Sequence, residues 1–147
     1  MRRIYILPLC ILLLFTFGCS KPMTEEDRVR AAVNGIAEAM EAKDLKAAIR
    51  YFSDDYNDEA GNDRSGIKGV LFHQIMRPGK LSVFVRGLEV KVEGSRALVD
   101  CKAALVRGDA IPDESAGYRF SVVFRKEDGD WKALSAKWER VGLMGLL

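Results

Sequence analysis

Few side chains in this chain of 147 residues have the chemistry for catalysis or metal binding. His73 is the only histidine, and Cys101 is the only cysteine beyond the first twenty residues. A zinc centre needs three or four Cys, His or carboxylate ligands held together. The sequence therefore predicts no metal site and no cofactor, and we expect Cys101, which lies in an apolar segment, to be a buried and unreactive thiol.

One cluster of carboxylates lies near the middle of the chain. Its members are Asp54, Asp55, Asp58 and Glu59. Their spacing lacks the alternating ligands and the glycine of a common calcium loop, so we interpret the cluster as a solvated helix end. An enzymatic alternative stays open, in which Asp58 or Glu59 acts as a base together with Tyr118 or His73. His73 lies away from the apolar face of its predicted helix, which favours a solvated histidine.

The candidate ligand-binding residues are side chains that are polar or amphipathic but fall among apolar neighbours. They are Tyr56, Gln74, Tyr118 and Trp138. Gln74 lies at the centre of an apolar helix face and Tyr118 on the apolar face of a strand, where an amide or hydroxyl needs a partner. Such residues would line a pocket with apolar walls and a few polar groups. The alternative is that they bond within a closed core.

The N-terminal residues have the pattern of an export signal. Arg2 and Arg3 precede an apolar run over residues 4–17, which is shorter than the roughly 20 residues that span a bilayer. Residues 15–20 (Phe-Thr-Phe-Gly-Cys-Ser) resemble the lipobox of bacterial lipoproteins, whose cysteine receives diacylglycerol. The resemblance implies a signal peptide over residues 1–18, lipid on Cys19 and a tether over residues 19–23. The alternatives are an ordinary signal peptide and a transmembrane anchor.

This resemblance also implies where the protein lies. Serine at position 20 is typical of lipoproteins that are sorted to the outer membrane, so we expect a lipid-anchored protein of the cell envelope facing the periplasm. Removing Arg2 and Arg3 from the 23 basic residues leaves 21, which equals the number of acidic residues. Such a neutral balance excludes the concentrated basic face that nucleic-acid binding requires.

Helical periodicity dominates the first half of the remaining chain. Thr24 is a suitable N-cap for a helix with apolar residues between positions 29 and 40, although Gly35 interrupts it. Asp44 is expected to cap a second helix whose apolar face extends to Phe52. Ser65 is expected to cap a third helix that ends before Pro78. These patterns predict three helices.

From residue 81 onward, apolar and polar residues alternate with a period of two, as in β-strands. The inward-facing residues of the first predicted strand are Phe84, Leu88, Val90 and Val92. Alternating apolar residues continue over positions 97–105 and 118–124, and a last strand is expected over residues 131–140. Helices followed by strands indicate an α+β domain.

Several motifs support a family resemblance. Residues 42–45 (Ala-Lys-Asp-Leu), 51–56 (Tyr-Phe-Ser-Asp-Asp-Tyr), 92–99 and 128–132 (Asp-Gly-Asp-Trp-Lys) follow one another in a characteristic order. They resemble the nuclear transport factor two-like superfamily, which includes ketosteroid isomerases and polyketide cyclases of the SnoaL-like type. The resemblance implies a cone-shaped, cystatin-like domain over residues 24–141. In this domain, three N-terminal helices pack on a curved four-stranded antiparallel sheet. An apolar tail at residues 142–147 follows the domain.

The resemblance also implies positions for an isomerase active site, and these positions hold Ile36, Ala60 and Val122. None of these side chains polarises a carbonyl or abstracts a proton. Our preferred hypothesis is therefore a non-catalytic module that binds a small molecule or an envelope protein, with homodimerisation left open. The alternative is a small-molecule enzyme of the cyclase, dehydratase or hydrolase type.

Overall fold

The computed structural model describes residues 21–108 and 116–142. The predicted signal peptide 1–18, Cys19 and the tail residues 143–147 lie outside this part. The elements in chain order are α1 (Glu25–Glu41), α2 (Leu45–Ile49), β1 (Phe52–Asp58), α3 (Arg64–Met76), β2 (Leu81–Glu93), β3 (Arg96–Arg107), β4 (Ala116–Glu127) and β5 (Asp130–Val141). Within the described ranges, no helix has the length and apolar character to cross a bilayer.

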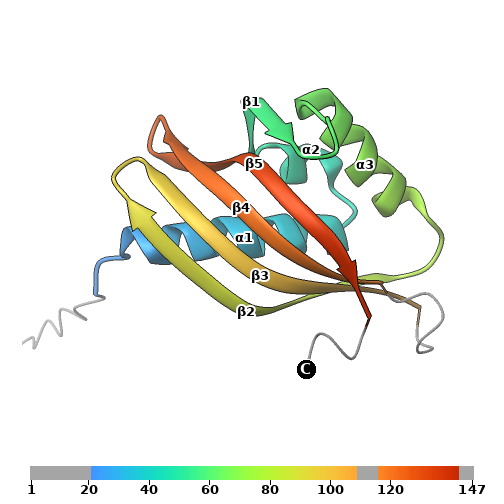
Figure 1. The fold of residues 1–147 in the computed structure, drawn as a ribbon. Helices are drawn as coiled ribbons and strands as arrows, with labels where there is room; N and C mark the ends of the chain where they lie inside the picture. Colours follow the sequence, from blue (N-terminus) through green and yellow to red (C-terminus); the bar gives the residue numbers. More distant parts are fainter. Residues whose placement is uncertain (1–20, 109–115, 143–147) are drawn as a thin grey trace, which may run out of the picture.

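The strands form one curved sheet of five members in the order β1-β5-β4-β3-β2. Strands β2 to β5 form an antiparallel meander, whereas β1 pairs in parallel with β5. Helix α1 runs along the inner side of the sheet, and α2 and α3 lie beside β1 (Figure 1). The α+β class is confirmed, but the prediction of four antiparallel strands is wrong because it missed β1.

Strand β1 begins at Phe52, a residue that local periodicity assigned to the end of the second helix, and continues through residues that were expected at the helix end and in the following loop. Helix α2 ends at Ile49. Two residues later, the carbonyl of Tyr51 accepts a hydrogen bond of 2.7 Å from the Ala133 amide of β5. Phe52 then lies opposite Ala133 in the ladder. A five-residue helix has little stability of its own, so pairing with β5 decides the conformation of the next residues. The acidic cluster consequently lies on and just after an edge strand, and its interpretation as a solvated helix end is wrong.

Helix α1 begins as predicted. The Thr24 hydroxyl accepts from the Asp27 amide at 3.1 Å, and the Asp27 carboxylate accepts from the Thr24 amide, which together form a capping box. Gly35 is required inside the helix because an added Cβ would lie 2.2 Å from the hydroxyl oxygen of Tyr51. The Tyr51 ring therefore crosses α1 at the one residue without a side chain.

A β-bulge in the edge strand β2 corrects one part of the predicted pattern. Phe84 was expected on the inner face, but it is 53% exposed. The register with β3 shifts between Arg86 and Glu89, where Gly87 has a φ of +59°. This extra residue reverses the alternation, so that odd-numbered positions face inward before the bulge and even-numbered positions after it. The Leu88 carbonyl at the bulge accepts a hydrogen bond of 2.7 Å from Arg30 of α1.

The other predicted strands agree with the structure. Ala97, Val99, Cys101 and Ala103 of β3 are all buried, and the alternation continues in β4. In β5 it changes phase between Ala133 and Ala136, both buried, where the register with β4 shifts. Helix α3 begins two residues earlier than expected, because Asp63 rather than Ser65 is its N-cap and accepts from the Gly66 amide at 2.8 Å. The core lies between α1, α3 and the inner face of the sheet.

Candidate functional site

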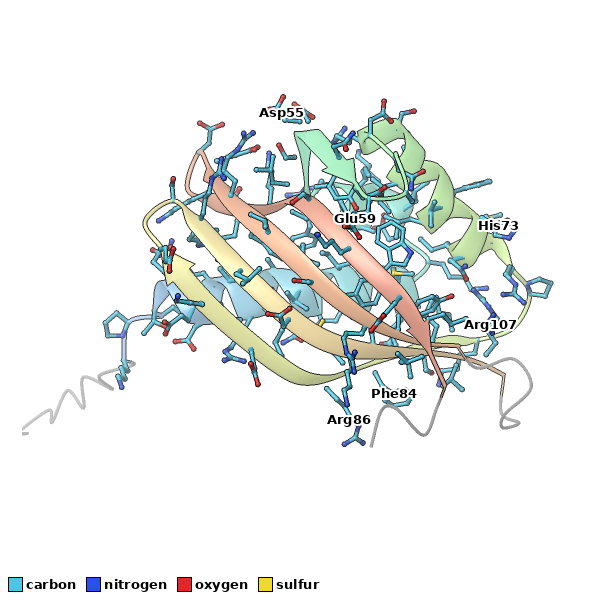
Figure 2. All side chains as sticks on the ribbon, viewed as in Figure 1. Asp55, Glu59, His73, Phe84, Arg86 and Arg107 are labelled. Carbon is cyan, nitrogen blue, oxygen red and sulfur yellow. The ribbon has the colours of Figure 1, made fainter. Side chains whose placement is uncertain are left out.

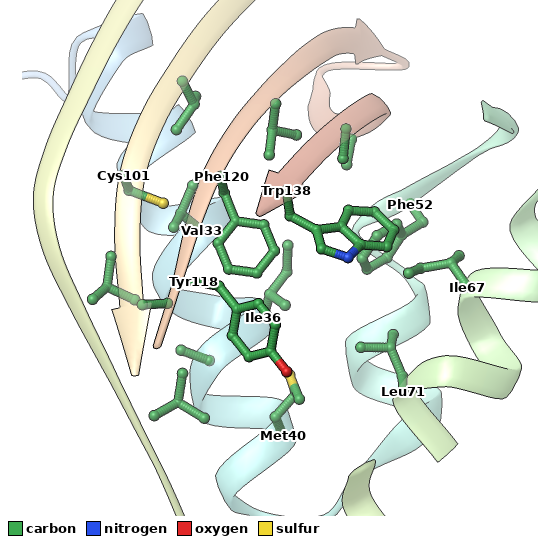
Figure 3. Close-up of a pocket in the computed structure, with 18 of the residues that line it drawn as sticks. Val33, Ile36, Met40, Phe52, Ile67, Leu71, Cys101, Tyr118, Phe120 and Trp138 are labelled. Carbon is green, nitrogen blue, oxygen red and sulfur yellow. The ribbon is translucent and has the colours of Figure 1, made fainter. Parts of the chain in front are cut away.

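The core between the helices and the sheet is not completely filled. A cavity of about 230 Å³ remains there, and Tyr118, Phe120 and Trp138 project into it from the strands (Figure 3). Helix α1 contributes Val33, Ile36, Ala37 and Met40, and helix α3 contributes Ile67, Val70, Leu71 and Gln74. Several α1 residues that face the sheet are only half-buried, because the cavity leaves them exposed on that side. A completely filled core would bury them.

The lining of this cavity contains no Asp, Glu, Lys, Arg or His among the described residues. Most of it is aliphatic or aromatic. All four predicted ligand-binding residues, Tyr56, Gln74, Tyr118 and Trp138, belong to the lining. The sequence therefore predicted the residues that bring polar atoms to the cavity wall, while their role in binding stays a prediction.

Tyr56 differs from the other three because its hydroxyl already has a partner. It is 2% exposed and donates to the Asp58 carboxylate at 3.2 Å. Burial, and then the negative charge of Asp58, raise the pKa of Tyr56 far above its ordinary value. Asp58 is itself 5% exposed and accepts from the Asn62 amide at 2.8 Å. Tyr56 therefore offers the cavity its ring, and its hydroxyl orders the β1–α3 connection.

Gln74 is held by a residue that the sequence analysis did not single out. Arg107, at the end of β3, is 5% exposed and donates to the Gln74 side-chain oxygen at 3.2 Å. It also donates to the backbone carbonyls of Gln74 and, at 3.5 Å, of Arg77. These carbonyls belong to the end of α3, where helix geometry leaves them without partners. Arg107 lies on the same alternating face of β3 as Ala103 and Leu105. This alternation in the sequence could have indicated that the Arg107 side chain faces inward.

Tyr118 and Trp138 belong to a row of aromatic rings on neighbouring strands. The ring centroids of Tyr118 and Phe120 are 5.9 Å apart, and those of Phe120 and Trp138 are 6.4 Å apart. Among the described residues, neither the Tyr118 hydroxyl nor the Trp138 Nε1 has a hydrogen-bond partner. No buried side-chain nitrogen or oxygen in this part of the chain lacks a partner. The two unpaired groups are therefore ones that remain accessible, as expected of groups that face the cavity.

Of the groups considered for the enzymatic alternative, Tyr118 belongs to the cavity lining and Asp58 contacts the lining residue Tyr56, whereas Glu59 and His73 lie elsewhere. Glu59 is exposed and pairs with Lys137 at 2.8 Å, and His73 lies exposed on the outer side of α3 (Figure 2). The isomerase positions Ile36 and Val122 are aliphatic members of the lining, whereas Ala60 is exposed and outside it.

Cys101 belongs to the lining, and burial raises the pKa of its thiol to about 11. A thiol with such a pKa is a poor nucleophile at neutral pH. Within the described residues, no group of His, Cys, Asp and Glu side chains is arranged to hold a metal ion.

The end of the sheet away from Arg107 is closed by a polar network. The Ser53 hydroxyl, which is fully buried, donates to Glu127 at 2.6 Å. Arg125 contacts Glu127 at 2.5 Å and Asp55 at 2.7 Å. The hydrogen bond from Ser53, more than the charge of Arg125, lowers the pKa of Glu127. This network joins β1 to the end of β4.

Comparison with known proteins agrees with this architecture. The family model of the SnoaL-like domain matches residues 29–137. No curated protein matches the chain in sequence. Among solved structures, a proposed dehydratase of the NTF2-like (nuclear transport factor two-like) family from Streptomyces avermitilis is 20% identical with a TM-score of 0.69, covering 82% of this chain and 99% of that one.

Two further structures extend the comparison. An NTF2-like protein of unknown function from Pseudomonas putida is 18% identical with a TM-score of 0.68, covering 83% of this chain and 91% of that one. A protein of unknown function with a cystatin-like fold from Nostoc punctiforme is 12% identical with a TM-score of 0.66, covering 85% and 98%. At such identities the likeness establishes the fold and leaves the chemistry open.

Proposed function

The chain belongs to the SnoaL-like domain family, and on this premise we propose that its cavity binds a small, uncharged, largely apolar molecule without transforming it. The observation that supports this proposal is a cavity of about 230 Å³ whose described lining contains no charged side chain. Ligand pockets are usually apolar with a few polar groups and have roughly 300–1,000 Å³. The ligand is therefore small, of the size of one or two fused rings.

The lining argues for an uncharged ligand. A buried charge without a paired counter-ion loses its hydration and gains nothing comparable in return. Two arginines donate to lining residues: Arg64 to the Phe52 carbonyl, and Arg107 to Gln74 and the end of α3. A carboxylate or ammonium ligand would therefore bind more weakly than a neutral molecule of the same shape.

The same lining argues against catalysis in the cavity. General acid–base catalysis works best with groups whose pKa lies near the working pH. The ionisable groups of the described lining with a shifted pKa are Tyr56 and Cys101, and both are shifted upward, away from neutrality. Asp58 is directed to Tyr56 and Asn62, and Glu59 to Lys137. The cyclase, dehydratase or hydrolase alternative would need a base that this lining does not supply.

We further propose that lipid on Cys19 anchors the domain to the outer membrane, facing the periplasm. The support is the lipobox-like segment at residues 15–20, which precedes helix α1 by only a short tether. Several acyl chains together anchor a protein almost permanently. The variant Cys19→Ser should move the protein from the membrane fraction to the soluble periplasmic fraction. If the variant stays in the membrane fraction, the lipid anchor is wrong.

Matched neutral and charged probes test the binding proposal. Isothermal titration should show that 2-acetylnaphthalene binds and that 2-naphthoate, a carboxylate of similar shape, binds at least about tenfold more weakly. Ala103→Leu, which adds three carbons to the lining, should abolish binding. Ala104→Leu is the matched control because Ala104 lies on the opposite face of β3 and outside the lining. Equal binding of both probes, or binding that survives Ala103→Leu, would refute the proposal.

A further inference from the structure

The hydrogen bond between Arg107 and Gln74 fixes which end of the glutamine amide faces the cavity. A guanidinium group only donates hydrogen bonds, so the atom that lies 3.2 Å from it must be the amide oxygen and not the nitrogen. Gln74 belongs to the cavity lining, and among the described residues its amide nitrogen has no partner. The glutamine therefore presents a donor to whatever occupies the cavity.

The other unpaired groups lie at the same end of the cavity. Tyr118 pairs with Ala103 in the ladder between β3 and β4, and Arg107 lies four residues further along β3. Trp138 pairs with Phe120, two residues from Tyr118. Indole nitrogen only donates, and a phenol hydroxyl both donates and accepts. Toward the other end of β4 the lining becomes fully apolar, with Phe124 at 1% exposure.

We propose that Arg107 is a positioning residue that holds Gln74 as a hydrogen-bond donor, and that the ligand places an acceptor oxygen, such as a carbonyl or ether, at this end of the cavity. The inference rests on the proposed function, because it specifies the ligand of the same cavity. It adds an orientation: the acceptor lies near the end of α3, and the apolar part extends toward Phe124.

A purely structural role for Arg107 is the competing explanation. Arg107 also binds the backbone carbonyls of Gln74 and Arg77, so its loss would loosen the end of α3 and weaken every ligand alike. A preference between two ligands of the same shape separates the explanations, because loosening changes both affinities equally. Orientation of the amide changes only the affinity of the ligand that carries the acceptor.

The test compares 2-acetylnaphthalene with 2-isopropenylnaphthalene, in which a methylene group replaces the ketone oxygen. For the unaltered protein we expect the ketone to bind more tightly by about 3- to 10-fold, the value of one hydrogen bond between neutral groups. Gln74→Leu should lower this ratio severalfold. Gln74→Glu should lower it as far, because a carboxylate paired with Arg107 has no donor left for the ketone. His73→Ala, on the outer side of the same helix, should leave the ratio unchanged.

Variants of Arg107 complete the test. Arg107→Met should lower the ketone-to-alkene ratio, and Arg107→Lys, which keeps a donor toward the Gln74 oxygen, should restore most of it. If Arg107→Met does not fold, the two Gln74 variants decide the question alone. An unchanged ratio in the Gln74 variants overturns the inference and leaves the proposed function intact. Failure of both probes to bind the unaltered protein refutes the proposed function and this inference with it.

Discussion

Filling the cavity should stabilise the protein while it removes the binding site. Ala103 is 6% exposed and belongs to the cavity lining. Ala103→Leu adds three carbons, and burial of each is worth about 0.8 kcal/mol, so the free energy of unfolding should rise by about 2 kcal/mol. For a domain of this size, a change of about 1 kcal/mol corresponds to about 4 °C. The midpoint of thermal unfolding should therefore rise by about 8 °C.

The assay is thermal and urea unfolding of the purified protein followed by circular dichroism. The control, Ala104→Leu, adds the same carbons to the opposite face of β3, where the cavity gives them no space to fill, so its midpoint should stay within about 2 °C. Destabilisation of Ala103→Leu by about 1–3 kcal/mol, the usual cost of overpacking, would show that the cavity is not empty space in solution. That result would refute the reasoning from volume.

Three further predictions concern stability and reactivity. Gly35→Ala should destabilise the protein by about 1–3 kcal/mol in urea unfolding, since the new Cβ would lie 2.2 Å from the Tyr51 hydroxyl oxygen. In a Tyr51→Ala background, Gly35→Ala should instead stabilise the protein by up to about 1 kcal/mol. A change of stability with the same sign in both backgrounds would contradict the contact between Gly35 and Tyr51. Glu127 has a pKa below its ordinary 4.5, so its contribution to stability is present above that pH and is lost as pH falls through the lowered pKa; Glu127→Gln should flatten the loss of stability on acidification, and an equal slope in both proteins would show that Glu127 is not responsible. Cys101, with its pKa near 11, should react with iodoacetamide at pH 8 far more slowly in the folded protein than in urea, and equal rates would show that the thiol is exposed.

The sequence predicted those features that depend on neighbours a few residues apart. The capping box at Thr24 needs only the side chain of Asp27, three residues on. The inward residues of β3 follow from alternation alone, as does the position of Tyr118 on the inner face of β4. Gln74 was found because a polar residue in an apolar helical stripe is visible in the order of residue types.

The errors in the predicted fold arise where distant segments decide the conformation. Phe52 begins a strand because Ala133 lies beside it, and no local pattern contains that information. The inner face of β2 changes phase at a bulge, and Phe84 consequently faces outward. A bulge depends on the pairing of two strands, so alternation within one strand does not predict it.

The candidate site divides in the same way. Sequence alone determined the fold class, the resemblance to the nuclear transport factor two-like superfamily and the four polar residues that line the cavity. Only the tertiary structure decided that space remains between them, because a cavity is the volume left after α1, α3 and the sheet have packed. It also decided that the Tyr56 hydroxyl donates to Asp58 and that Arg107 donates to the Gln74 side-chain oxygen. The Arg107–Gln74 contact joins residues 33 positions apart, and such contacts arise from the path of the whole chain.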